Sequence, residues 1–114
     1  MLALTSAPSV GHDRGDRWIT AGRSALFYED YVLSIKYFNL AIGAKPYLYE
    51  PWYFRSVAKF SLDDYMGAES DATEALQLNP YVNDIYDLRA ICRIRQNNYE
   101  EAIKDKNLYL IHIQ

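Results

Sequence analysis

Hydrophobic residues recur along this chain at steps of three and four, which is the spacing of one face of an α-helix. Two stretches of small or apolar residues show the spacing clearly: Trp18, Ala21, Gly22 and Ala25, and then Ile35, Phe38, Leu40 and Ala41. The same periodicity, interrupted by short polar turns, predicts six amphipathic helices near residues 16–28, 31–44, 49–62, 65–78, 83–96 and 99–113. We therefore expect an all-α protein with short connections.

The pattern itself repeats at a constant 34-residue step, which we call the repeat step. Two acidic or amide residues followed by a tyrosine occur three times, with the tyrosines at Tyr31, Tyr65 and Tyr99. Pro46 and Pro80 are separated by the same step. The acidic or amide residues suit the N-terminal cap of a helix, and the prolines suit the link that follows the end of one. Each unit is thus predicted to be two helices joined by a tight turn, with the tyrosine packed at that turn.

The repeat divides the chain into units at about 15–48, 49–82 and 83–114, which together form one domain (15–114). Residues 1–14 lack periodicity and are predicted to form a flexible arm. A single hairpin cannot bury its apolar face alone, so we expect three stacked antiparallel hairpins that share one continuous core.

Several positions in these units resemble the tetratricopeptide repeat: Trp18, Gly22, Phe38, Ala41 and Pro46, then Trp52, Ala68, Ala75 and Pro80, then Ala90 and Ala102. The third unit departs from the family pattern at Tyr109 and Gln114, where Ala and Pro are usual. The resemblance implies a right-handed superhelical solenoid whose concave groove, lined by the first helix of each unit, holds a peptide or a partner's helix. The stretch EDYVLSIKYFNLAIGAKPYL is also similar to exported repeat proteins of Bacteroides-type bacteria. The compartment stays open between the cytoplasm and export to the periplasm.

Composition narrows the possible partners. With 12 basic and 15 acidic residues, the net charge of −3 disfavours a nucleic-acid partner. No stretch contains the ~18 apolar residues that a membrane span needs. The single cysteine, Cys92, excludes an internal disulfide and lies in an apolar helical run, so we expect it to be buried.

No set of residues indicates catalysis, a cofactor or a metal. His12 and His112 are far apart in sequence and have no second ligand at a metal-binding spacing. The adjacent carboxylates Asp63 and Asp64 are explained by a helix cap. We therefore predict a protein-binding role and no enzyme.

The groove implied by the resemblance would present apolar and aromatic side chains rimmed by charge: Arg23, Phe27, Tyr53, Phe54, Val57, Phe60, Leu88, Ile91 and Arg95. Some of them would instead pack between adjacent units. Relatives that clamp acidic chaperone tails use Lys, Asn and Arg at positions that match Ile19, Arg23, Phe54, Asp84 and Leu88 here. Only Arg23 keeps a positive charge, so we expect a partner with apolar anchors and basic residues.

The last helix suggests an alternative function. Residues Leu108 to Ile113 are apolar almost all round, whereas the end of a solenoid usually has a polar outer face. Either further repeats cover this helix, or the chain forms a homo-oligomer through it. The favoured hypothesis is an adaptor or scaffold that binds a protein or peptide, and the alternative is a structural, self-associating repeat module.

Two further patterns predict specific contacts. Arg55 precedes Asp71 by the same sequence separation by which Arg89 precedes Asp105, while the first unit has Ala21 and Tyr37 at these places. Each Arg and Asp is expected to form an ion pair across its hairpin.

The small residues Gly22, Ser56 and Ala90 follow the repeat step. They are expected to lie where paired helices approach closely, so a bulkier side chain there would overpack the crossing.

Overall fold

The computed structural model describes residues 13–112, with side chains described as far as Asn107. Within this range the chain forms six α-helices and no strand: α1 Arg14–Phe27, α2 Tyr31–Ala44, α3 Tyr49–Ser61, α4 Tyr65–Leu78, α5 Asn83–Arg95 and α6 Tyr99–His112. These bounds agree closely with the predicted helices, and the predicted all-α class is confirmed. Helix α1 begins inside the segment predicted as an arm, whose residues 1–12 lie outside the described part.

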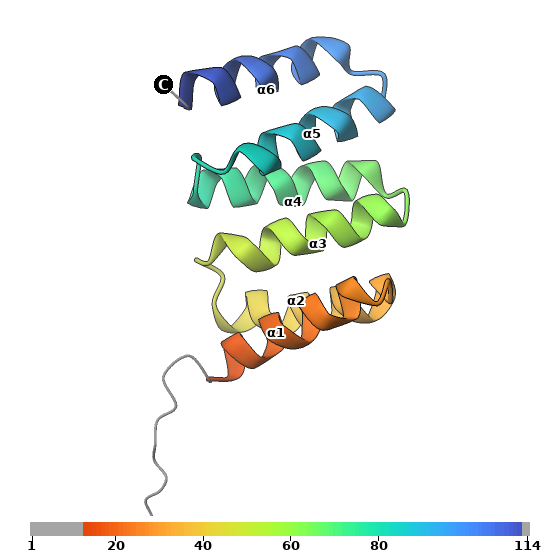
Figure 1. Ribbon diagram of the computed structural model, residues 1–114, viewed down its shortest axis with the longest axis vertical. Coiled ribbons are helices and arrows are strands. Elements are labelled where there is room, and N and C mark those ends of the chain that lie inside the picture. The colour runs from red at the N-terminus through yellow and green to blue at the C-terminus, as the bar shows by residue number, and fades with distance from the viewer. Residues whose placement is uncertain (1–12, 113–114) are drawn as a thin grey trace, which may run out of the picture.

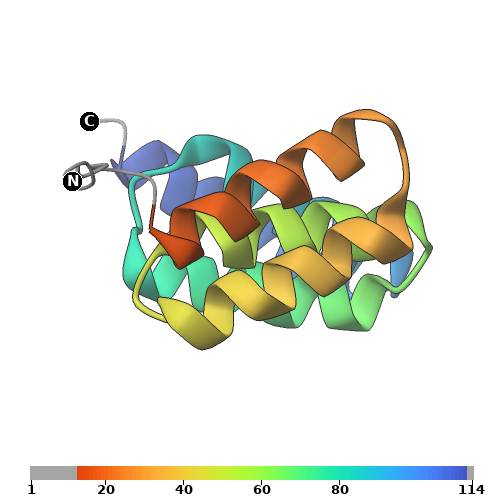
Figure 2. The same cartoon turned by 90° about the horizontal axis from the view of Figure 1, so that it is seen from below.

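Consecutive helices pair into three hairpins that stack into an elongated array (Figure 1). Helices α1, α3 and α5 contact one another in turn, whereas α2 makes no contact with α4. Seen along the stack, α1 and α2 lie on opposite sides of it (Figure 2). The first helices of the hairpins therefore share one side of the molecule, which we call the α1–α3–α5 face.

The turn inside each hairpin explains the motif of two acidic or amide residues followed by a tyrosine. Glu29, Asp63 and Asn97 have φ angles of 62°, 64° and 63°, the left-handed conformation that ends many helices. The next residue caps the following helix: Asp30 accepts a hydrogen bond from the Leu33 backbone N–H, and Asp64 accepts one from Gly67. The predicted capping role is confirmed for these two aspartates.

The links between hairpins are held by a second repeated contact. The indole Nε1 of Trp52 donates to the Pro46 carbonyl oxygen over 2.9 Å, and the Tyr86 hydroxyl donates to the Pro80 carbonyl oxygen over 2.8 Å. Tyr86 stands one repeat step after Trp52, so a phenol does in the third unit what an indole does in the second. The aromatic ring packs against the core while its polar atom satisfies a carbonyl group of the link.

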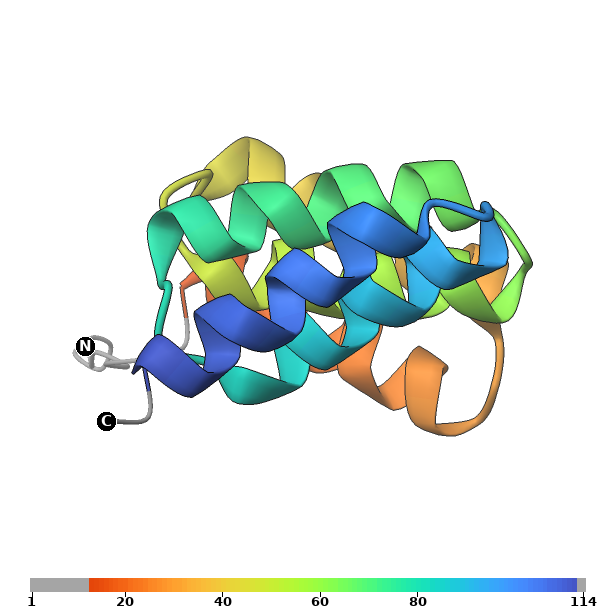
Figure 3. The ribbon, with the colours of Figure 1, turned by 90° about the horizontal axis from the view of Figure 1, so that it is seen from above.

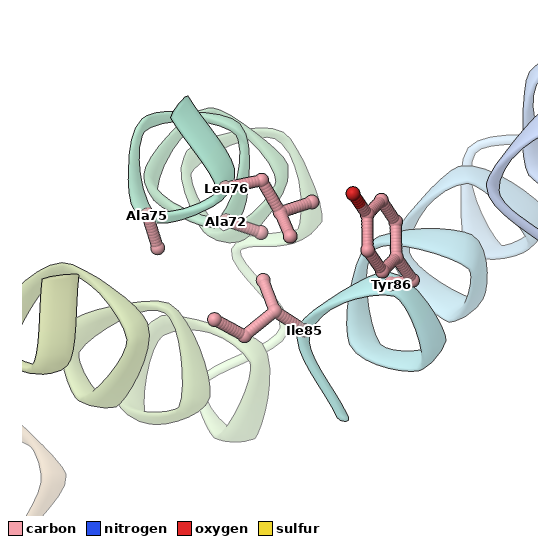
Figure 4. Packing of buried hydrophobic residues seen from close by; sticks show 5 residues of the cluster. All are labelled: Ala72, Ala75, Leu76, Ile85 and Tyr86. Carbon is pink, nitrogen blue, oxygen red and sulfur yellow. The ribbon is translucent and has the colours of Figure 1, made fainter. Parts of the chain in front are cut away.

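The core is continuous between neighbouring hairpins because small residues let the helices approach closely. Between α4 and α5 it contains Ala72, Ala75, Leu76, Ile85 and Tyr86, all of them buried (Figure 4). The alanines on α4 leave room for Ile85 and Tyr86, which project from α5.

Close approach also occurs within hairpins, as predicted. A Cβ atom added to Gly22 would lie 2.5 Å from Phe38 Cε1. The Ser56 hydroxyl is buried and donates to the Ala68 carbonyl oxygen over 2.6 Å. Ala90 is 3% exposed. All three positions are therefore buried, and at Gly22 the distance to Phe38 leaves no space for a larger side chain.

The motif tyrosines Tyr65 and Tyr99 both contact the turn of their own hairpin, because their hydroxyls donate to Asp63 and Asn97 over 2.9 and 3.0 Å, but only Tyr65 is also covered by a following hairpin. The ring of Tyr65 meets that of Phe60 across the turn at 5.4 Å, and its hydroxyl accepts a hydrogen bond from Arg95 of the next hairpin. Tyr99 is 57% exposed, because no described helix stacks on the hairpin of α5 and α6 (Figure 3). Among the described residues, no helix combines the length and the apolar character needed to cross a membrane.

Candidate protein-binding face

Phe54 lies at the centre of the α1–α3–α5 face. Its ring stacks on buried Phe38 at 5.9 Å and touches Tyr53 at 5.2 Å between ring centroids. The guanidinium of Arg23, from α1, lies 5.0 Å above the same ring. An arginine over an aromatic face is held by a cation–π attraction, so the ring of Phe54 favours a position of the Arg23 charge above it. Phe54 thus joins the first two hairpins and supports a surface cation.

A second cluster of this kind joins the second and third hairpins. The Arg95 guanidinium lies 5.4 Å from the ring centroids of both Phe60 and Tyr65. Its Nη1 also donates to the Tyr65 hydroxyl over 2.8 Å. Arg95 is exposed, so this cluster again places a positive charge on an aromatic support at the surface.

The predicted groove residues divide by exposure. Arg23, Phe27, Ile91 and Arg95 are exposed, whereas Tyr53, Phe54, Val57, Phe60 and Leu88 are half-buried. The exposed residues come from α1 and α5, and the half-buried ones come mostly from α3 in the middle. Phe54 and Phe60 already pack against neighbouring side chains, so a ligand would meet only part of each ring.

Acidic residues lie at the N-terminal ends of the helices that form this face. Asp16, Glu50 and Asp84 lie in the first turns of α1, α3 and α5, where a carboxylate complements the helix dipole. Burial raises the pKa of the Tyr53 phenol, and the Asp84 carboxylate raises it further. Tyr53 therefore stays a neutral hydroxyl at physiological pH, next to an acidic edge.

The predicted ion pairs are present inside the second and third hairpins. Arg55 Nε and Nη2 donate to the two oxygens of Asp71, each over 2.8 Å. Arg89 Nε and Nη2 both donate to Asp105 Oδ1, over 2.9 and 2.6 Å. The two aspartates are almost fully buried, so these pairs belong to the interior.

Each buried aspartate has a second cation that sequence reasoning missed. Lys59 Nζ lies 3.0 Å from Asp71 Oδ2, and Arg93 Nη1 lies 2.8 Å from Asp105 Oδ2. Burial alone would lower the pKa of Arg93, but hydrogen bonding to Glu69 and the charges of Asp105 and Glu69 raise it overall. The sequence did contain a signal for these second cations, because Lys59 and Arg93 are basic residues one repeat step apart.

Arg55 and Arg89 also connect adjacent hairpins. Arg55 Nη1 donates to Asn39 Oδ1 over 2.7 Å, and Arg89 Nη1 donates to Thr73 Oγ1 over 3.1 Å. Asn39 and Thr73 each belong to the preceding hairpin and are themselves one repeat step apart. These contacts orient α3 and α5, the helices that carry most of the candidate face.

Cys92 is fully buried, as predicted, and burial raises the pKa of its thiol to about 11. Among the described residues, no group of three His, Cys, Asp or Glu side chains is placed to hold a metal ion.

The fold matches solved structures over most of its length. The first repeat domain of Spaghetti (RPAP3), bound to the HSP90 peptide SRMEEVD, is 25% identical, with 91% of this chain and 84% of that chain covered and a TM-score of 0.83. The OM64 TPR domain of Arabidopsis is 20% identical over 90% and 84% of the two chains (TM-score 0.84). The TPR2B domain of yeast Sti1, in complex with pHsp70, is 18% identical over 84% and 77% (TM-score 0.81). No protein-family model and no curated protein matches the sequence.

Proposed function

We propose that this chain, which folds as three tandem tetratricopeptide repeats, is an adaptor or scaffold that binds a peptide or a partner's helix on its α1–α3–α5 face. The observation that carries the proposal is the arrangement of that face. The first helices of the three hairpins carry apolar side chains and two arginines, Arg23 and Arg95, that are each supported by an aromatic ring. Rigid aromatic and arginine side chains at partly desolvated positions are typical of residues that dominate binding energy.

The structural neighbours support a peptide as the ligand. One of them, the first repeat domain of RPAP3, is bound to SRMEEVD, a peptide with three acidic residues. In this chain the positions expected to clamp such a tail are Ile19, Arg23, Phe54, Asp84 and Leu88. Only Arg23 among them is a cation, and Asp84 is a carboxylate, so these positions are not suited to bind an acidic tail.

The acidic residues at the edge of the face also make this chain unsuited to an acidic tail. Asp16, Glu50 and Asp84 would repel an acidic tail and attract a basic one, because complementary charge selects partners. We therefore propose a ligand with apolar anchor residues and a basic segment, in which the anchors contact Ile91 and Val57.

Selection from a phage-displayed library of random peptides tests the proposal. The enriched peptides, once synthesised, should bind the intact chain and should be richer in apolar and basic residues than the starting library. Replacement of Ile91 by Glu should weaken their binding by about tenfold or more, which corresponds to ~1.4 kcal/mol lost at one anchor. Leu40→Glu is the matched control, because Leu40 is 48% exposed on α2 and Ile91 is 41% exposed on α5.

Two results would contradict the proposal. Equal weakening by Ile91→Glu and Leu40→Glu would mean that the peptides do not use the α1–α3–α5 face. Binding of synthetic SRMEEVD in preference to the selected peptides would mean that the ligand is an acidic tail after all.

A further inference from the structure

Five polar side chains meet at the boundary between the second and third hairpins, two from the second hairpin and three from the third. Glu69 of α4 accepts hydrogen bonds from Arg93 Nε and Gln96 Nε2, each over 2.8 Å. Close by, the Tyr65 hydroxyl accepts one from Arg95 Nη1, also over 2.8 Å. At this boundary, polar groups on the second hairpin therefore pair with polar groups on the third. We call the side of a hairpin that faces the next one along the chain its outgoing side, and the side that faces the previous one its incoming side.

The outgoing side of the third hairpin, which we call the C-terminal face, has changed at one of these positions. Ile103 stands one repeat step after Glu69 and is 61% exposed. Tyr99 stands one repeat step after Tyr65 and is 57% exposed. The carboxylate that accepts two hydrogen bonds inside the array is thus replaced by an exposed aliphatic side chain.

The incoming side of the first hairpin, the N-terminal face, has changed in the matching way. Ala25, Phe27 and Tyr28 stand two repeat steps before the polar residues Arg93, Arg95 and Gln96. Three polar side chains on the incoming side are thus replaced by a small one and two aromatic ones. Tyr28 is 77% exposed and Phe27 78%. The carboxylate is therefore absent from the C-terminal face, and the two guanidinium groups and the amide are absent from the N-terminal face, at positions that would meet one another.

Each of the two end faces also contains a hollow beside the residues that have changed. A hollow of about 330 Å³ lies beside Tyr28 on the N-terminal face, because Ala21 and Ala25 stand where the later hairpins carry Arg or Lys. Another hollow, of about 270 Å³, is lined by Tyr99 and Ile103 on the C-terminal face. Figures 2 and 3 look at the array from these two ends.

We propose that the partner of each end face is a second copy of this chain. The C-terminal face of one copy docks on the N-terminal face of the next, with Ile103 against Ala25 and Tyr28, and Tyr99 against Phe27. The contact continues the stacking that already joins the hairpins. Its two surfaces differ, so it is a head-to-tail contact that leaves a free face at each end of the assembly. Its mass should therefore rise with concentration beyond that of a dimer.

Light scattering coupled to size-exclusion chromatography tests the proposal on the full chain. The monomer mass is 13.2 kDa, and the measured mass should climb past twice that value as concentration increases. Ile103→Glu and Tyr28→Glu should each return the chain to a monomer, because each places a charge in one half of the contact. Met66→Glu, at an exposed position on α4, should leave the association unchanged.

Mixing the two monomeric variants is the decisive step. The Ile103→Glu chain keeps an intact N-terminal face and the Tyr28→Glu chain an intact C-terminal face, so the mixture should form a species of twice the monomer mass and no larger. Far-ultraviolet circular dichroism checks that each variant is folded, and Ile103→Gln with Tyr28→Gln form a milder pair if one is not.

Several results would overturn the proposal. They are a wild-type chain that stays at 13.2 kDa at every concentration, a mixture that stays monomeric, and a Tyr28→Glu chain that dimerises alone through two C-terminal faces. None of these results depends on Ile91, so failure here leaves the proposed peptide-binding face untouched.

Discussion

The third and first hairpins fill the same interior position with different chemistry. In the third, the carboxylate of Asp105 is fully buried between Arg89 and Arg93. In the first, the matching residues are Tyr37, Ala21 and Ala25, and Tyr37 stacks on Trp18 with 5.8 Å between ring centroids. The repeat therefore specifies a position that either an aromatic stack or an ion cluster can occupy, and in the first hairpin a hollow remains beside Ala21, Ala25 and Tyr37.

The two solutions differ in how they tolerate change. An aromatic stack loses area in proportion to what is removed, whereas a buried ion cluster depends on every member. A lone buried charge has lost its hydration without gaining a partner, and that cost is far greater than the net value of the intact cluster. The third hairpin should thus be more sensitive than the first to single substitutions.

The largest expected effect comes from breaking the cluster at its centre. Asp105→Ala leaves Arg89 and Arg93 facing each other without their carboxylate, and should lower the free energy of unfolding by about 3–5 kcal/mol. The triple variant Arg89→Ala, Arg93→Ala and Asp105→Tyr, which copies the first hairpin, should lose less than Asp105→Ala alone. Urea denaturation followed by circular dichroism measures both values. A triple variant as unstable as the sum of its single changes would show that the ions are not coupled.

This cluster also marks the limit of what the sequence could predict. The repeat step predicted the six helices, the capping aspartates and the pairs of Arg55 with Asp71 and Arg89 with Asp105, because these depend on residue type at a fixed spacing. It did not reveal that Glu29, Asp63 and Asn97 take the left-handed conformation, since the pattern placed these residues at the start of the second helix of each hairpin and not at the end of the first. Nor could spacing show which apolar residues are exposed, because exposure depends on whether a neighbouring hairpin covers the position, as Tyr65 and Tyr99 show.

The predicted groove residues stay a hypothesis for the same reason. Helical periodicity places Phe54 and Ile91 on one side of the molecule, but it cannot distinguish a side chain that packs between hairpins from one that awaits a ligand. Phe54 contacts Phe38, Tyr53 and Arg23, whereas Ile91 is exposed. Ile91 is therefore the more informative position for a binding experiment.

A glycine inside the first hairpin gives the second-largest effect. In an open helix, Gly→Ala stabilises by about 1 kcal/mol. At Gly22 the new Cβ would lie 2.5 Å from Phe38 Cε1, so Gly22→Ala should instead destabilise by ~1–3 kcal/mol through overpacking. Gly43 on α2 is the matched control, because nothing lies within 4 Å of a Cβ built there and Gly43→Ala should stabilise the chain. Thermal denaturation would contradict this account if both changes moved the melting temperature in the same direction.

A smaller effect is expected for the hydrogen bond that joins Arg89, a member of the buried ion cluster, to the preceding hairpin. Thr73 Oγ1 accepts a hydrogen bond from Arg89 Nη1 over 3.1 Å, and Thr73→Val keeps the shape of the side chain while removing that acceptor. The cost should be about 1 kcal/mol, the usual net value of one hydrogen bond, measured by urea denaturation. Thr20→Val, at an exposed position on α1, should change the stability by less than ~0.5 kcal/mol. Equal values for the two variants would mean that the contact between hairpins contributes nothing.

The smallest effect concerns the turn that all three hairpins share. Glu29 and Asn97 have φ angles of 62° and 63°, but asparagine adopts this conformation more readily than glutamate. Glu29→Asn should therefore stabilise the chain by about 0.5 kcal/mol, within the range of improved helix caps, and Asn97→Glu should destabilise it by a similar amount. Because each variant copies a residue that the other hairpin already uses, the two changes together should nearly cancel in urea denaturation. A shift of the same sign from both would contradict this account, because the two variants exchange the same pair of residues in opposite directions.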